Sequence, residues 1–182
     1  LPVSGGEVLK ENFVGSHFKN YDYYVVLSHF KGHGMAGFGG SIKNISIGMA
    51  SGSGKSWIHS GGTRKSGISG SQEAFTKSMA EAGKSVVDSL KGSILYINVM
   101  NRLSVDCDCN GNPAQPEIHD IGILSSFDPV ALDQACVDLI WNAEGSKNLV
   151  SRITARNGLL TLEHAQKIGL GSREYTLVNI DG

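Results

Sequence analysis

Residues 23–45 read YYVVLSHFKGHGMAGFGGSIKNI and join an apolar run to a glycine-rich segment. The first six residues are too few for a helix and rich in β-formers, so they predict a buried strand over 23–28. From His29 to Gly70 the sequence is mostly glycine, serine, lysine, histidine and small apolar residues. We therefore expect a long loop over 29–70, with a short helix or strand at 42–50. A loop of this length in a compact domain is generally functional or disordered.

The rest of the chain alternates helical and extended patterns. Apolar spacing and end signals predict helices over 71–92, 128–144 and 161–168, and β-branched or apolar runs predict strands over 94–99, 118–124 and 175–180. Asp128-Pro129 starts the second helix, with Asp as N-cap and Pro at the first helical position. This alternation predicts a single α/β domain over 1–182, with a mixed or mostly parallel sheet flanked by helices.

Composition narrows the class of protein. The chain has 182 residues, 40% of them hydrophobic, and a formal net charge of -1 without runs of like charge. This balance predicts a packed core and argues against a nucleic-acid or membrane-surface partner. No run approaches the ~20 apolar residues of a membrane span. With three cysteines we expect a reducing, cytoplasmic location, although a chain that starts at Leu1 leaves open a removed export signal and a longer parent protein.

The glycine-rich segment is the candidate binding site, because α/β folds place ligands at the carboxyl ends of strands. Glycines such as Gly37, Gly39 and Gly40 let backbone N–H groups approach a ligand, and Lys43 supplies a cation. We therefore expect a small anionic partner. His29 and His33 lie four residues apart, which is a metal-site spacing on a helix. In a loop this spacing is equally typical of ordinary polar residues.

A phosphate-binding P-loop is excluded by spacing. The string Gly52-Ser-Gly-Lys-Ser56 resembles the end of that motif, but the glycine required five positions before Gly54 is replaced by Met49. The preceding strand is also in the wrong place. We reject a nucleoside-triphosphatase.

Several strings together resemble the bacterial and archaeal family catalogued as domain of unknown function 362. They are SHFKGH (28–33), GFGGSIKN (37–44), AS (50–51), GK (54–55), YIN (96–98), DCDC (106–109), DIGIL (120–124), DPVALDQA (128–135) and GLGS (169–172). Many members carry a ferredoxin-like insert with cysteine quartets, whereas residues 60–71 here contain no cysteine. An iron–sulfur cluster of that type is therefore not expected. Members usually have a further N-terminal region as well, so the resemblance implies that this chain is the C-terminal part of a longer protein.

A more distant resemblance is to the nickel-pincer lactate racemases, which have a similar His, Gly-Gly, Lys, His order. The corresponding residues are His33, Lys43 and His59, ten and sixteen positions apart. The resemblance implies that His33 is an acid/base, Lys43 anchors a cofactor or takes part in catalysis, and His59 ligates a divalent metal such as nickel or zinc. The implied reaction is racemisation or isomerisation by proton transfer next to a carboxylate or carbonyl.

Two alternatives remain open. Cys107 and Cys109, with His29 or His119, could ligate a metal and make the protein a redox or iron–sulfur accessory. Equally, the two cysteines could be free thiols beside a turn. The other alternative is a non-catalytic domain whose glycine-rich loop binds an anion.

Three further residues have structural expectations. Asp133 lies in the first two turns of its helix, where an acid interacts favourably with the helix dipole. Cys136 is expected to be a buried small hydrophobe, and His164 to lie on the surface.

Overall fold

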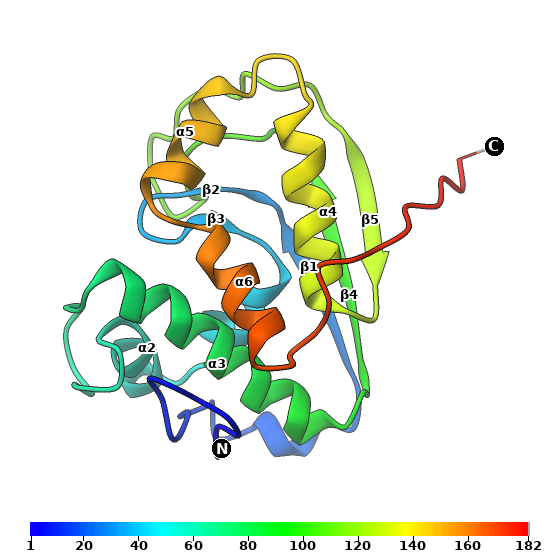
Figure 1. Ribbon diagram of the computed structural model, residues 1–182. Coiled ribbons are helices and arrows are strands. Elements are labelled where there is room, and N and C mark those ends of the chain that lie inside the picture. Colours follow the sequence, from blue (N-terminus) through cyan, green and yellow to red (C-terminus); the bar gives the residue numbers. More distant parts are fainter. Residues whose placement is uncertain (182) are drawn as a thin grey trace.

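A three-stranded mixed sheet organises the chain, of which the computed structural model describes residues 1–181. Strands β1 (Tyr24–His29) and β4 (Ile94–Met100) run parallel, and β5 (Gly122–Ser126) runs antiparallel to β4 (Figure 1). The predicted α/β class with a mixed sheet is confirmed. Gly182, the end of the predicted domain, lies outside the described residues.

The segment 29–70 is folded more regularly than the expected loop. It contains the hairpin strands β2 (Lys31–His33) and β3 (Gly37–Gly39), the short helix α1 (Ser41–Lys43), the π-helical turn η2 (Asn44–Gly48) and the helix α2 (Gly52–His59). The short helix expected within 42–50 is confirmed by α1 and η2, whereas the loop expected over the rest of 29–70 is wrong where β2, β3 and α2 form. Each element is too short and too glycine-rich to show a periodicity, and tertiary contacts hold it in place.

The helices lie on one face of the sheet (Figure 1). They are α3 (Gln72–Leu90), α4 (Pro129–Trp141), α5 (Lys147–Ala155) and α6 (Leu159–Lys167), preceded by the 3-10 turn η1 (Phe18–Asn20). Helix α4 packs on β4 and β5, and α6 packs on α3. Residues Ile94, Tyr96 and Met100 of β4 are buried beneath them.

The opposite face of the sheet is apolar and lacks helical cover among the described residues. Val25 and Leu27 of β1 and Ile123 of β5 are 59%, 64% and 70% exposed. Leu27 is paired with Ile97, and Ile123 with Val99. The strand periodicity thus places apolar side chains on both faces, as in sheets covered on both sides.

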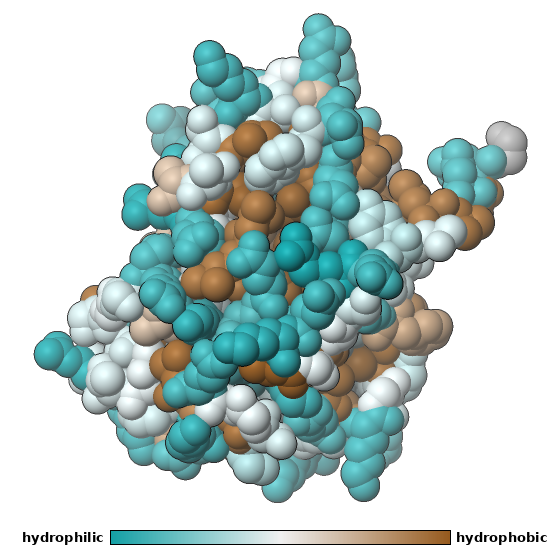
Figure 2. All heavy atoms as spheres, in the orientation of Figure 1, coloured by the Kyte–Doolittle hydropathy of each residue, from teal (hydrophilic) through white to brown (hydrophobic). Residues whose placement is uncertain are grey.

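One helix was missed, and two strand predictions differ from the structure. Helix α5 was not predicted, and β5 begins at Gly122 instead of residue 118. Residues 175–180 form no strand, and Leu177, Val178 and Ile180 are exposed. The C-terminal segment projects from the body with apolar surface along it (Figure 2), and its residues 175–178 and 180 line a cavity together with residues of β5 and α4. A β-forming run needs a sheet edge to pair with, and sequence periodicity does not report one.

No described helix has both the length and the apolar character needed to cross a bilayer.

A buried carboxylate ties the N-terminal segment to α3. Glu81 is fully buried and accepts hydrogen bonds from the backbone N–H groups of Glu7, Val8 and Leu9, the last at 2.6 Å. It also pairs with His164 Nε2 at 2.8 Å. His164 is therefore buried, and the expectation of a surface position is wrong, because its helix turns this side chain toward α3.

Candidate functional site

A cavity of about 290 Å³ opens at the carboxyl end of β1, as expected for ligand sites in α/β folds. Its charged lining consists of Lys31, Lys43, Lys55 and Asp108. The remaining wall is formed by Leu27, Ser28, His29, Gly39, Gly40, Asn44, Ile47 and Gly48. The lining thus contains three lysines and one carboxylate, and we call this cavity the lysine cavity. Of the predicted binding residues, Gly39, Gly40 and Lys43 line this cavity.

The three lysines come from three different elements: Lys31 from β2, Lys43 from the end of α1 and Lys55 from α2. Lys31 Nζ lies 3.1 Å from Asp108 Oδ2. Within residues 1–181, Lys43 and Lys55 have no carboxylate within 4.0 Å. A Cβ at Gly39 would lie 3.3 Å from Lys43 Cδ and 3.7 Å from Lys31 Nζ. The absence of a side chain at Gly39 therefore lets two cationic side chains share this wall.

The electrostatic environment of Lys43 is unfavourable for its charge. Burial lowers the pKa of Lys43, the neighbouring Lys31 lowers it further, and Lys55 adds to the effect. The nearby thiols Cys107 and Cys109 act in the opposite direction. Lys43 is thus a half-buried cation among cations, an arrangement typical of functional sites.

Helix α1, which presents Lys43, is locked in place by Asp133 of α4. The fully buried Asp133 carboxylate accepts hydrogen bonds from the Ser41 N–H at 2.8 Å, the Ile42 N–H at 2.9 Å and the Asn98 amide at 2.8 Å. A Cβ at Gly40 would lie 2.4 Å from Asp133 Oδ1, so only glycine allows this approach.

Burial raises the pKa of Asp133 to about 6, although the three donors oppose the shift. Asp133 therefore positions the glycine-rich segment, instead of interacting only with its own helix dipole as expected. The signal available in the sequence is a single acid among the apolar residues of VALDQACV. Cys136 is buried as predicted.

His33, on β2, is held as a neutral imidazole. Its Nδ1 accepts hydrogen bonds from the backbone N–H groups of Met35 and Ala36, at 3.2 and 3.0 Å. The ring proton therefore resides on Nε2. Burial lowers the pKa of His33 to about 4, with further contributions from Lys43 and Lys31.

His59, at the end of α2, has the opposite tautomer. Its Nδ1–H donates to the Lys55 carbonyl at 2.6 Å, and the ring stacks on Phe75 with centroids 4.6 Å apart. The Nε2 lone pair is therefore free to accept a proton or bind a metal. Burial lowers the pKa of His59, and Lys43 and Lys55 lower it further, against the effect of the backbone hydrogen bond.

The predicted trio of His33, Lys43 and His59 shares one electrostatic neighbourhood, since the charge of Lys43 lowers the pKa of both histidines. Only Lys43 lines the cavity. Gly37 lies away from it, at the hairpin turn: its φ of +83° favours glycine, and a Cβ there would lie 3.1 to 3.2 Å from the backbone of Ile153 and Gly158.

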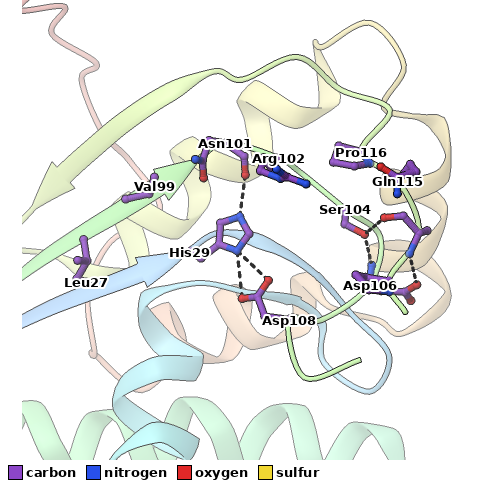
Figure 3. Close-up of a pocket in the computed structure, with 12 residues that line it drawn as sticks. Leu27, His29, Val99, Asn101, Arg102, Ser104, Asp106, Asp108, Gln115 and Pro116 are labelled. Carbon is purple, nitrogen blue, oxygen red and sulfur yellow. Dashed lines mark hydrogen bonds and ion pairs between the residues drawn. The ribbon is translucent and has the colours of Figure 1, made fainter. Parts of the chain in front are cut away.

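His29 forms part of a wall shared with a second cavity of about 490 Å³ (Figure 3). Figure 3 shows its ring between the Asn101 carbonyl, 2.7 Å from Nε2, and the Asp108 carboxylate, 2.9 Å from Nδ1. Both ring nitrogens therefore face protein acceptors. Asp108 in turn pairs with Lys31, so His29 and Asp108 orient the rim of the lysine cavity.

The predicted metal ligands are not gathered into one group. Cys107 and Cys109 are free, and the Cys109 N–H donates to Cys107 Sγ at 3.4 Å. Within residues 1–181 there is no group of three or more His, Cys, Asp or Glu side chains placed to hold a metal ion. Among the histidines predicted as ligands, His29 has both ring nitrogens hydrogen-bonded, His59 Nε2 has no partner within residues 1–181, and His119 is exposed.

Comparison with known proteins gives one match. Residues 1–138 match the model of the family described as Domain of unknown function (DUF362). No curated protein and no solved structure matches the chain. The similarity to nickel-pincer lactate racemases therefore stays a prediction. Because the family match spans most of its length, this chain belongs to the DUF362 family.

Proposed function

We propose that the lysine cavity binds a small molecule that carries a carboxylate or phosphate group. The observation that carries this proposal is the imbalance of charge in the lining, where Lys31, Lys43 and Lys55 face the single carboxylate of Asp108. Arrays of ammonium groups are general recognition sites for such anions.

Binding an anion would offset the unfavourable electrostatic environment of the Lys43 ammonium group. Its pKa is lowered by burial and by Lys31, which means that the protonated form is disfavoured when no anion lies beside it. An anion at the same place stabilises the protonated form. The walls at Gly39 and Gly40 add backbone surface without side chains, so a ligand can come close to the main chain.

Calorimetric titration with inorganic phosphate, and separately with pyruvate, tests the proposal. We expect one saturable site whose affinity falls with added salt. In Lys43→Met the affinity should fall roughly tenfold or more, the cost of one lost charge-assisted contact. Lys147→Met is the matched control, because Lys147 is an exposed lysine at the start of α5, outside the cavity lining. Equal affinities for wild type and both variants would contradict the proposal, as would no binding at all.

A second candidate is proton transfer at a carbon next to a carboxylate or carbonyl. It is favoured by the opposite tautomers of His33 and His59 beside Lys43, which give one N–H donor and one free acceptor. For a metal, His59 Nε2 would be one ligand, so most of the coordination shell would have to come from a bound cofactor.

This candidate has its own experiment. Incubation with lactate in D₂O, followed by proton NMR, should show loss of the C2 proton, and this exchange should stop in His59→Gln. Elemental analysis of the purified protein reports any nickel or zinc. Lactate that stays fully protonated would count against proton transfer on this substrate while leaving anion binding intact.

A further inference from the structure

Lys43 is the half-buried amine of the cavity that has no partner among the described residues. Lys31 is held by Asp108, and Lys55 is exposed on α2. Lys43 is half-buried, and within residues 1–181 its Nζ makes neither a hydrogen bond nor an ion pair. Its helix is held by the buried Asp133, so the backbone that presents this amine to the cavity is fixed by the fold.

We propose that Lys43 is a nucleophile that forms an imine with a small anion carrying an aldehyde or ketone, such as a 2-oxo acid, while Lys31 and Lys55 hold its acidic group. This inference rests on the proposed function, because the two flanking cations are what would bring the carbonyl compound to Lys43. It adds a covalent step and narrows the ligand class from anions to anionic carbonyl compounds.

The environment of Lys43 suits this role. A lysine attacks a carbonyl through the lone pair of its neutral amine, and neighbouring cations or an apolar surrounding increase the neutral fraction. Burial lowers the pKa of Lys43, and the charges of Lys31 and Lys55 lower it further. Lys147, by contrast, is exposed to solvent.

The reaction balances without an oxidant or reductant. The Lys43 nitrogen forms a bond to the carbonyl carbon while the carbon–oxygen π bond breaks, which gives a carbinolamine. The oxygen then leaves as water, carrying the two protons that the amine loses, and a carbon–nitrogen double bond forms. His33, with a proton on Nε2, and His59, with a free Nε2, supply a donor and an acceptor in the electrostatic neighbourhood of Lys43.

Reductive trapping with pyruvate tests this step. Cyanoborohydride delivers hydride to the imine carbon and leaves a stable secondary amine, which intact mass and peptide mapping can locate. We expect one adduct at Lys43, suppressed by excess phosphate, and much weaker labelling with acetone, which has the carbonyl but no charge. Lys43→Arg keeps a cation but forms no imine, so it should lose the adduct, with its folding checked by circular dichroism.

The outcomes separate the two proposals. Phosphate binding without a pyruvate adduct at Lys43 would overturn the imine and leave the anion site standing. Absence of both phosphate binding and adduct would overturn the anion site as well. Equal labelling of Lys43 and Lys147, or an undiminished adduct in Lys43→Arg, would show surface chemistry and refute the assignment.

Discussion

Asp133 and Lys43 lie in the same part of the molecule, but the fold supplies hydrogen-bond partners to the charge of Asp133 and none to the charge of Lys43 among the described residues. Asp133 is an anion surrounded by three N–H donors, two of them from the backbone of α1. Lys43, at the end of α1, is a half-buried cation, and the neighbouring charge of Lys31 lowers its pKa. The buried charge with donors builds the scaffold, whereas the cation without a carboxylate partner marks a site that a ligand would complete.

Removing the scaffold charge should have the largest effect. In Asp133→Ala two backbone N–H groups and the Asn98 amide lose their acceptor in a buried place. We expect a loss of about 3 kcal/mol or more in the free energy of unfolding, measured by urea denaturation. The control is Asp88→Ala, an exposed i,i+4 partner of Lys84, which should cost less than about 0.5 kcal/mol. Similar losses in the two variants would contradict the assigned role of Asp133.

Glu81 extends the comparison to a carboxylate far from the cavity. Glu81→Gln retains one acceptor oxygen but weakens the bonds to the N–H groups of Val8 and Leu9 and to His164. We expect a loss of about 2 kcal/mol and faster hydrogen exchange at the Val8 and Leu9 amides. Phosphate binding should not change, because Glu81 lies outside the cavity lining. Unchanged exchange at these amides would refute the role of Glu81 as an anchor.

The sequence was informative where one local pattern decides the structure. The strands around Val26 and Tyr96, helix α3 and the Asp128 cap follow from periodicity and end signals. The strand over 175–180 was predicted from the same kind of pattern and does not form, because pairing depends on a partner edge.

The site was predictable in its location but not in its organisation. The glycine-rich segment and Lys43 were identified from sequence, whereas the contribution of Lys55 and Asp108 depends on folding that brings α2 and the loop after β4 to β1. The tautomers of His33 and His59 also depend on backbone groups that no spacing reveals. Asp133 was assigned to its helix dipole because its backbone partners on α1 lie more than ninety residues away in the sequence.

Removing the one carboxylate of the cavity lining should strengthen anion binding. Asp108→Asn frees Lys31 from its ion pair and leaves three lysines without a carboxylate in the lining. We expect phosphate to bind about two- to fivefold more tightly, since Asp108 is exposed and solvent screens its charge. Calorimetry of wild type and variant side by side measures this change. Weaker binding in Asp108→Asn would contradict the charge account.

The titration of His33 gives a smaller effect. Its pKa is lowered to about 4 from 6.5, so between these values the unfolded chain binds more protons than the folded chain. His33 should therefore make the protein more stable as the pH rises through this window. NMR titration of the ring should show the lowered pKa, and phosphate should raise it by offsetting the lysine charges. A ring that titrates near 6.5 would contradict the described environment.

Lys43 has no carboxylate partner among the described residues, and we infer that a bound anion stabilises its charge. NMR titration of its Cε resonance measures the pKa of Lys43 and tests this most directly. We expect the pKa of Lys43 to lie below the ordinary value of 10.5 and to rise when phosphate saturates the site. The Lys147 resonance in the same spectra serves as a reference that phosphate should leave in place. A Lys43 resonance that titrates at the ordinary value and does not respond to phosphate would contradict the account.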